Sequence, residues 1–170
     1  MLDFLCDSEC MRLQLIGIGR TKAGAERELT ARYLERAGQA GRAIGFPSVE
    51  LREIEESRAR RGDERKAQEG KAIRALLQPA SLIVAFDEHG RSIDSEGFAD
   101  CLGQARDSGK AMMHFLIGGA DGLEPALTES AAFVFAFGKM TWPHQLVRIM
   151  AAEQIYRAMT ILGHHPYHRA

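Results

Sequence analysis

Apolar and polar residues follow one another in blocks along the chain, and the blocks predict strands and helices in turn. Strands are expected at residues 11–18, 49–54, 81–86, 112–117 and 132–137, where apolar residues run continuously or alternate with polar ones. Helices are expected at 25–37, from the cap Asp63 to Leu77, at 95–105 and at 146–162. The alternation predicts one α/β domain, with a mainly parallel sheet that helices cover on both faces.

The loop before the last helix is built from residues that stop one element and start another. Gly138 permits a turn after the strand at 132–137. Thr141 or Trp142 is expected to cap the helix, and Pro143 is expected in its first turn, where a missing N–H costs nothing. A strand that ends in a tight loop is therefore followed at once by a helix.

The helix at 146–162 is apolar over more than one face, so we expect it to be buried in its own core or against a partner. Glu153 and Arg157 lie four residues apart and are expected to form an ion pair. The tail at 163–169 contains three histidines, a tyrosine and an arginine. A tail this polar and aromatic can dock on a binding site.

Composition narrows the class of protein but not its partner. The chain has 170 residues and a formal net charge of −1, which argues against coating nucleic acid through bulk charge and leaves a local basic patch open. No stretch approaches the length of a membrane span. Three cysteines make neither a disulfide framework nor a paired zinc motif, so we expect a cytosolic protein without a metal.

Residues 1–10 contain three acids and no basic residue, unlike a secretory signal. We expect them to be a disordered leader or to precede the true start at Met11, with the domain at 11–170. The segment at 58–66 instead concentrates arginine and lysine among acids. A solvated surface is the usual interpretation of such a run, and a loop that faces RNA is the alternative.

Three loops can hold a ligand, because ligands of parallel sheets collect at the carboxyl ends of the strands. These loops are 86–90, 118–123 and 138–143. The glycines of the second match neither the dinucleotide fingerprint nor a phosphate-binding loop, and alone they would be weak evidence.

Four motifs in this order resemble the bacterial large-subunit rRNA pseudouridine N3-methyltransferases of the SPOUT superfamily. They are 117–123 (IGGADGL), 140–148 (MTWPHQLVR), 152–158 (AEQIYRA) and 163–169 (GHHPYHR). The resemblance extends from Met11 to the C-terminus. It implies an α/β fold with a C-terminal trefoil knot, which is a rare exception to the rule that chains do not thread loops. It also implies a homodimer that acts on 23S rRNA within the ribosome.

The resemblance further implies that S-adenosylmethionine is held by the three loops. The residues carried over by motif are Phe86, Gly118, Gly119, Gly138, Lys139, Met140, Thr141, Trp142 and Pro143. Many relatives have leucine where this chain has Phe86, a change that keeps an apolar wall for the adenine.

Methyl transfer from a sulfonium needs positioning and a nucleophile freed of its proton, and it needs no metal. Candidate catalytic residues are His144, Arg148, Tyr167, His168 and Arg169. An arginine can stabilise a developing anion at the imide, and a histidine can accept its proton. His144 can instead cap the helix, and the histidines at 164 and 165 can be solvated tail.

Three alternatives stay open at this point. They are a SPOUT methyltransferase that acts on another RNA such as tRNA, a non-catalytic ribosome-binding factor, and a plain nucleotide-binding α/β domain. The motif at 163–169 favours the rRNA enzyme, and the plain domain leaves that tail unexplained. The near-zero net charge suggests that the substrate is an assembled particle rather than naked RNA.

Overall fold

The computed structural model describes residues 10–167. The predictions for the leader at 1–9 and for His168 and Arg169 lie outside this range. Within it, five strands and five α-helices alternate, with one short 3₁₀ helix. They are β1 (Arg12–Ile18), α1 (Ala25–Gly41), η1 (Arg42–Ile44), β2 (Val49–Ile54), α2 (Gly62–Arg74), β3 (Leu82–Arg91), α3 (Ser95–Asp107), β4 (Met112–Ile117), α4 (Pro125–Ser130), β5 (Phe133–Phe135) and α5 (His144–Leu162).

The strands form one sheet in the order β2-β1-β4-β3-β5, and every pairing is parallel. The predicted parallel sheet is therefore confirmed. The central strand β4 is buried over all six of its residues, as expected for a strand covered on both faces. The trefoil knot stays a prediction.

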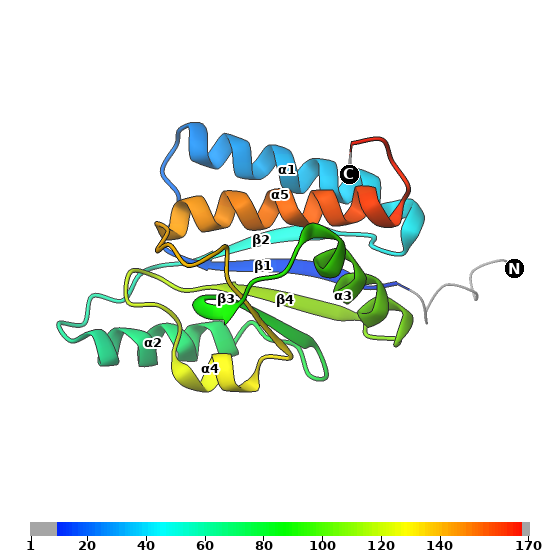
Figure 1. Cartoon of the computed structure of the whole chain (residues 1–170). Coiled ribbons are helices and arrows are strands. Elements are labelled where there is room, and N and C mark those ends of the chain that lie inside the picture. The colour runs from blue at the N-terminus through cyan, green and yellow to red at the C-terminus, as the bar shows by residue number, and fades with distance from the viewer. Residues whose placement is uncertain (1–9, 168–170) are drawn as a thin grey trace, which may run out of the picture.

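Helices cover both faces of the sheet, as predicted. Helices α1, α3 and α5 lie on one face, and α2 and α4 lie on the other (Figure 1). Along β1 the side chains alternate to match: Leu13 and Leu15 join the core beneath α5, whereas Ile16 and Ile18 join the core beneath α2. The apolar α5 packs against both α1 and α3, so its own chain covers much of it.

Several predicted boundaries were wrong. Strand β3 continues to Arg91, where a turn was expected, because the carbonyl of Arg91 accepts a bond from the N–H of Ala136 at 3.1 Å. Helix α2 begins at Gly62, so Asp63 lies in its first turn and pairs with Arg61 rather than capping the helix. The short helix α4 was not predicted.

The start of α5 also differs from the prediction. The helix begins at His144, and Pro143 occupies the cap position without a side-chain cap bond. Thr141 and Trp142 do not cap the helix, since their polar atoms bond elsewhere. His144 does not cap it either, whereas the expected ion pair between Glu153 and Arg157 is confirmed at 2.6 Å.

Among residues 10–167, no helix combines the length and the apolar character that a membrane span requires. The same residues contain no group of three or more His, Cys, Asp or Glu side chains able to hold a metal ion.

Candidate active site

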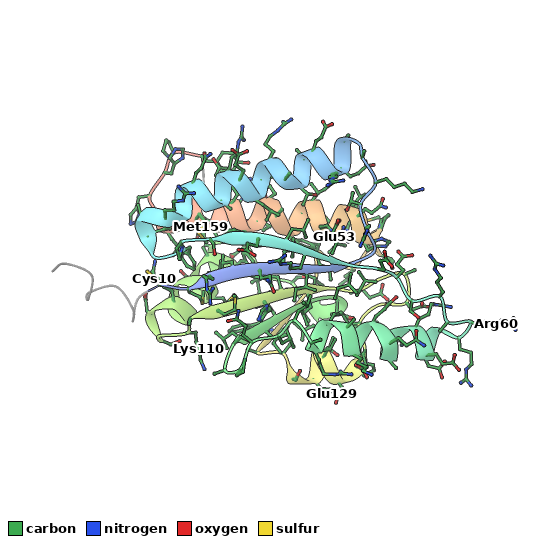
Figure 2. All side chains as sticks on the ribbon, turned by 180° about the vertical axis from the view of Figure 1, so that it is seen from behind. Cys10, Glu53, Arg60, Lys110, Glu129 and Met159 are labelled. Atoms are coloured by element: carbon green, nitrogen blue, oxygen red, sulfur yellow. The ribbon has the colours of Figure 1, made fainter. Side chains whose placement is uncertain are left out.

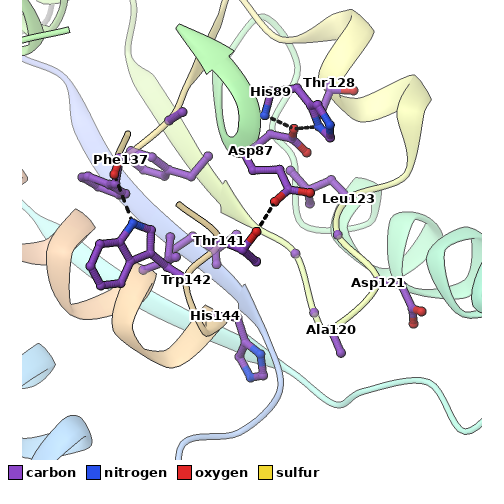
Figure 3. Close-up of a pocket in the computed structure, with 18 of the residues that line it drawn as sticks. Asp87, His89, Ala120, Asp121, Leu123, Thr128, Phe137, Thr141, Trp142 and His144 are labelled. Carbon is purple, nitrogen blue, oxygen red and sulfur yellow. Dashed lines mark hydrogen bonds and ion pairs between the residues drawn. The ribbon is translucent and has the colours of Figure 1, made fainter. Parts of the chain in front are cut away.

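A cavity of about 900 Å³ opens at the carboxyl edge of the sheet, where the segments after β3, β4 and β5 meet (Figure 3). These strands are neighbours in the sheet, and parallel neighbours bring their carboxyl ends together. The start of α5, Lys66 from α2, and Pro125 and Thr128 from α4 complete the lining. The three loops singled out in the sequence therefore form one site.

Eight of the nine residues expected to bind the cofactor line this cavity: Phe86, Gly118, Gly119, Gly138, Met140, Thr141, Trp142 and Pro143. The ninth, Lys139, is exposed and does not belong to the lining. The structure thus gathers these residues in one place, and their binding role stays a prediction.

The loop after β4 is folded so tightly that only glycine fits at its start. A Cβ on Gly118 would lie 2.5 Å from the carbonyl carbon of Gly122. Gly122 has φ +81° and donates its N–H to the oxygen of Gly119 at 3.0 Å, a conformation that side chains disfavour. The turn therefore places backbone, rather than side chains, against the cavity.

An aromatic wall closes the other side of the cavity. The rings of Phe86 and Phe137 stack with centroids 5.0 Å apart and an interplanar angle of 10°. Phe86 is also stacked on Phe115 of the core, at 6.2 Å. The wall is consequently held rigid from behind, and a flat apolar group can rest on it.

Two hydrogen bonds hold the loop between β5 and α5, one to strand β3 and one within the loop itself. The hydroxyl of Thr141 donates to Glu88 at 2.7 Å, and the indole N–H of Trp142 donates to the carbonyl of Phe137 at 3.1 Å (Figure 3). Met140, by contrast, is 72% exposed at the rim. Two hydrogen bonds thus hold an otherwise exposed loop in place.

Of the three predicted catalytic residues that the structure describes, only His144 lines the cavity. Its side chain is 24% exposed, and its Nε2 lies 3.7 Å from a carboxylate oxygen of Glu56. The ring therefore stands at the mouth of the cavity, where it can exchange a proton with a bound group.

Arg148 lies outside the cavity. Its side chain is 1% exposed, and its guanidinium donates to the carbonyls of Ile18 and Gly19 at 3.0 and 2.9 Å and to Glu53 at 2.6 Å. It also bonds to Thr21. All four partners belong to β1, β2 and the loop after β1, so in this chain the residue joins α5 to the sheet and does not face a ligand in the cavity.

The charge of Arg148 is balanced by Glu53. Burial raises the pKa of Glu53, but hydrogen bonds from Thr21 and the positive charge of Arg148 lower it more, so that the pKa falls below its ordinary value. Burial lowers the pKa of Arg148, against the effect of nearby carboxylates. The pair is a buried structural contact.

Tyr167 lies at the far end of α5 from His144. Its ring packs on Tyr156 with centroids 4.7 Å apart, and its hydroxyl lies 3.3 Å from a carboxylate oxygen of Glu153. The guanidinium of Arg157 stands 5.0 Å from the centre of the same ring. Tyr167 therefore packs against its own helix and does not line its own cavity.

Sequence reasoning missed two residues of α2 that support the glycine loop. Arg65 binds both carboxylate oxygens of Asp121, at 2.6 and 2.8 Å. Glu69 is buried beside Gly119 and accepts the N–H of Ser57 at 2.9 Å. Burial raises the pKa of Glu69 from its ordinary value. No motif identifies these contacts, because a helix far away in the chain supplies them.

Comparisons with known proteins agree with this geometry. A family model described as "Predicted SPOUT methyltransferase" matches residues 11–168. The chain is 58% identical over 159 residues to ribosomal RNA large subunit methyltransferase H of Methylocella silvestris, covering 94% of this chain and 99% of that protein. It is 53% identical over 160 residues to the protein of the same name from Sinorhizobium fredii, covering 94% of this chain and 100% of that protein.

Among solved structures, a probable methyltransferase from Bordetella pertussis Tohama I matches with a TM-score of 0.50 and 16% identity, covering 88% of this chain and 95% of that chain. This likeness concerns the fold alone. The family model and the two relatives decide the family: the chain belongs to the SPOUT methyltransferases, in the group of the ribosomal RNA large subunit methyltransferase H proteins.

Proposed function

We propose that the protein transfers the methyl group of S-adenosylmethionine to N3 of a pseudouridine in 23S rRNA, as a homodimer that acts on assembled ribosomes. The observation that carries the proposal is the cavity at the carboxyl edge of the sheet, since eight residues of the expected cofactor set line it. The names of the relatives support rRNA as the substrate class.

The lining fits the cofactor. Backbone of the turn at 118–122 can approach a ligand closely because a Cβ at Gly118 has no room. The stacked rings of Phe86 and Phe137 offer a flat wall to an adenine. When bound, S-adenosylmethionine supplies an activated methyl group. The loops at 118–122 and 138–143 orient the bound molecule, and Trp142 shields its side of the cavity from water.

The imide N3 must lose a proton to become a nucleophile, and His144 is placed to receive it. Its ring lines the cavity, and its Nε2 lies 3.7 Å from a carboxylate oxygen of Glu56. The oxygens beside N3 gain negative charge as the proton leaves, and an arginine of the tail is suited to stabilise it. Arg169 is the candidate for that role.

The tail must come from a second copy of the chain. Helix α5 has 19 residues and is about 28 Å long at a rise of about 1.5 Å per residue. His144 at its start lines the cavity, whereas Tyr167 follows its end. In a homodimer the tail of one protomer can complete the site of its partner.

Exposed apolar side chains near the start of α5 support this dimer. Met140, Trp142 and Leu146 are 72%, 40% and 40% exposed. Large apolar side chains that gather on a surface indicate an interface.

Transfer of a labelled methyl group from S-adenosylmethionine tests the proposal. The substrates are ribosomes that lack the modification, protein-free rRNA and tRNA, and the labelled nucleotide is then mapped. We expect label on one pseudouridine of the large subunit, only in assembled ribosomes. Label in tRNA would refute rRNA as the substrate. Equal label in protein-free rRNA would refute recognition of the assembled ribosome, and no label despite cofactor binding would refute methyl transfer by this protein.

A further inference from the structure

The loop between β2 and α2 presents exposed arginines at the carboxyl edge of the sheet, the edge at which the cavity opens. Residues 58–66 contain five basic and two acidic side chains, although the whole chain has a net charge of −1. Figure 2 shows Arg60 at the tip of this loop, at the opposite end of the molecule from Lys110. We call residues 58–61 the arginine segment. It lies at the carboxyl edge of the sheet, where β2 ends.

Two arginines of the segment are free to bind a partner. Arg61 is paired with Asp63 at 2.6 Å. Arg58 and Arg60 are exposed, and within residues 10–167 neither side chain makes an ion pair or a hydrogen bond. The nearest acids in the sequence are engaged elsewhere: Glu55 pairs with Arg20 at 3.4 Å, and Glu56 lies beside His144.

The backbone of the segment is held in place although its side chains are free. The N–H of Ser57 donates to the buried Glu69 at 2.9 Å, and its hydroxyl donates to Gln68 at 2.6 Å. The guanidinium of Arg65 donates to the carbonyls of Ala59 and Arg60, both at 3.0 Å. Little backbone entropy remains to be lost when a ligand binds, which favours recognition.

The same guanidinium fastens the segment to the cavity. Besides the two carbonyls of the arginine segment, Arg65 binds the carboxylate of Asp121 through two bonds of 2.6 and 2.8 Å. Asp121 belongs to the turn at 118–122 that lines the cavity, and Lys66, the next residue of α2, lines it too. Arg65 therefore links the segment directly to the turn that lines the cavity.

We propose that Arg58 and Arg60 bind phosphates of the rRNA strand beside the target nucleotide and so hold that nucleotide at the cavity. The inference rests on the proposed function, because it takes the reacting base to be part of an RNA strand. A guanidinium matches the geometry of a phosphate, and a chain with almost no net charge must bind RNA through local groups of this kind. The interaction is with the backbone and carries no base specificity.

The test is methyl transfer by the double variant Arg58→Gln/Arg60→Gln to ribosomes that lack the modification, at salt concentrations from about 50 to about 200 mM. We expect KM for ribosomes to rise about tenfold. The slope of log KM against log salt should fall by about 1.5, since each lost phosphate contact removes about 0.7 to 0.9. Affinity for S-adenosylmethionine, measured by calorimetry, should stay unchanged.

Two matched variants complete the experiment. Arg42→Gln/Lys110→Gln removes the same charge at the opposite edge of the sheet, where η1 and β4 begin, and it should leave both KM and slope unchanged. Arg58→Lys/Arg60→Lys keeps the charge and should restore most of the affinity and all of the slope.

Three results would overturn the inference while the wild-type protein remains active. They are an unchanged KM and slope in the glutamine variant, an equal effect in the control at the opposite edge, or a loss of affinity for S-adenosylmethionine. A wild-type protein that methylates no rRNA would instead refute the proposed function itself, so the two failures are distinguishable.

Discussion

Replacing Arg148 by methionine tests whether this buried guanidinium supports the fold or takes part in the chemistry. The change keeps most of the volume and removes the charge together with its bonds to Glu53, Thr21 and the carbonyls of Ile18 and Gly19. The two carbonyls then lack this donor, and the carboxylate of Glu53 keeps its hydrogen bonds from Thr21, including that from the N–H at 2.9 Å.

The expected loss of stability is large because the site is buried. Breaking a buried ion pair by removing one partner costs about 3 to 5 kcal/mol. Arg148 is 1% exposed, but the side chain of Glu53 is 23% exposed, so water can solvate part of the orphaned carboxylate. We therefore expect the free energy of unfolding to fall by about 3 kcal/mol, the lower end of that range.

Chemical unfolding in urea, followed by circular dichroism, measures this loss. Arg157→Met is the matched control, since Arg157 lies on the same helix and its ion pair with Glu153 is 26% and 17% exposed. The control should lose only about 0.5 kcal/mol, as expected for a helical pair near the surface. Arg148→Lys should remain destabilised, because an ammonium cannot reproduce the forked contacts.

Activity at low temperature, where the Arg148→Met variant is folded, separates the two roles. A structural role predicts that the folded fraction keeps a kcat within a few-fold of the wild type. A loss of stability below about 1 kcal/mol together with a loss of kcat above about a hundredfold would refute the structural role and make Arg148 a catalytic residue.

Three further predictions concern the cavity and the core. Gly118→Ala should abolish binding of S-adenosylmethionine in calorimetry, since its Cβ would lie 2.5 Å from backbone. The control Gly38→Ala should bind normally, because a Cβ there meets nothing within 4 Å. Equal affinities of the two variants would contradict the argument that the turn has no room for a Cβ at Gly118. Trp142→Ala should weaken cofactor binding about tenfold by loosening the loop at 136–143, within which the indole N–H donates to the carbonyl of Phe137. Trp142→Phe should lose less because its ring still packs, and unchanged affinity in both variants would exclude the loop from the site. His114 is fully buried, and burial lowers its pKa below the ordinary 6.5. The unfolded chain therefore takes up a proton at a higher pH than the folded chain, and the free energy of unfolding should fall as pH drops below about 6.5. His114→Met should show a smaller fall in urea titrations, and parallel pH profiles of the two proteins would refute the role of His114.

The sequence was sufficient to predict a mainly parallel sheet and the three loops that form the site. Two strands, at 49–54 and 112–117, begin and end where the apolar pattern predicts. Helices between successive strands require parallel pairing, and parallel pairing gathers the carboxyl ends. The cavity formed by the loops at 86–90, 118–123 and 138–143 follows from those two facts.

Boundaries at loops were less predictable, because contacts from other segments decide them. The bond between Arg91 and Ala136 extends β3 through an expected turn. Thr141 and Trp142 reach Glu88 and Phe137 instead of capping α5. Local propensity cannot anticipate a partner such as Glu88, which a distant strand supplies.

Arg148 shows most clearly what only the tertiary structure decided. The sequence placed it near the cofactor loop, on a helix whose apolar pattern identified the buried stripe, and that placement alone suggested chemistry. In the structure its partners lie 95 residues away at Glu53 and 130 residues away at Ile18. Gly17 makes room for it, since a Cβ there would stand 2.6 Å from the guanidinium. The periodic pattern of one chain segment determines which elements form, because that pattern is local; whether a charged side chain faces a ligand or a buried carboxylate depends on segments that only folding brings together.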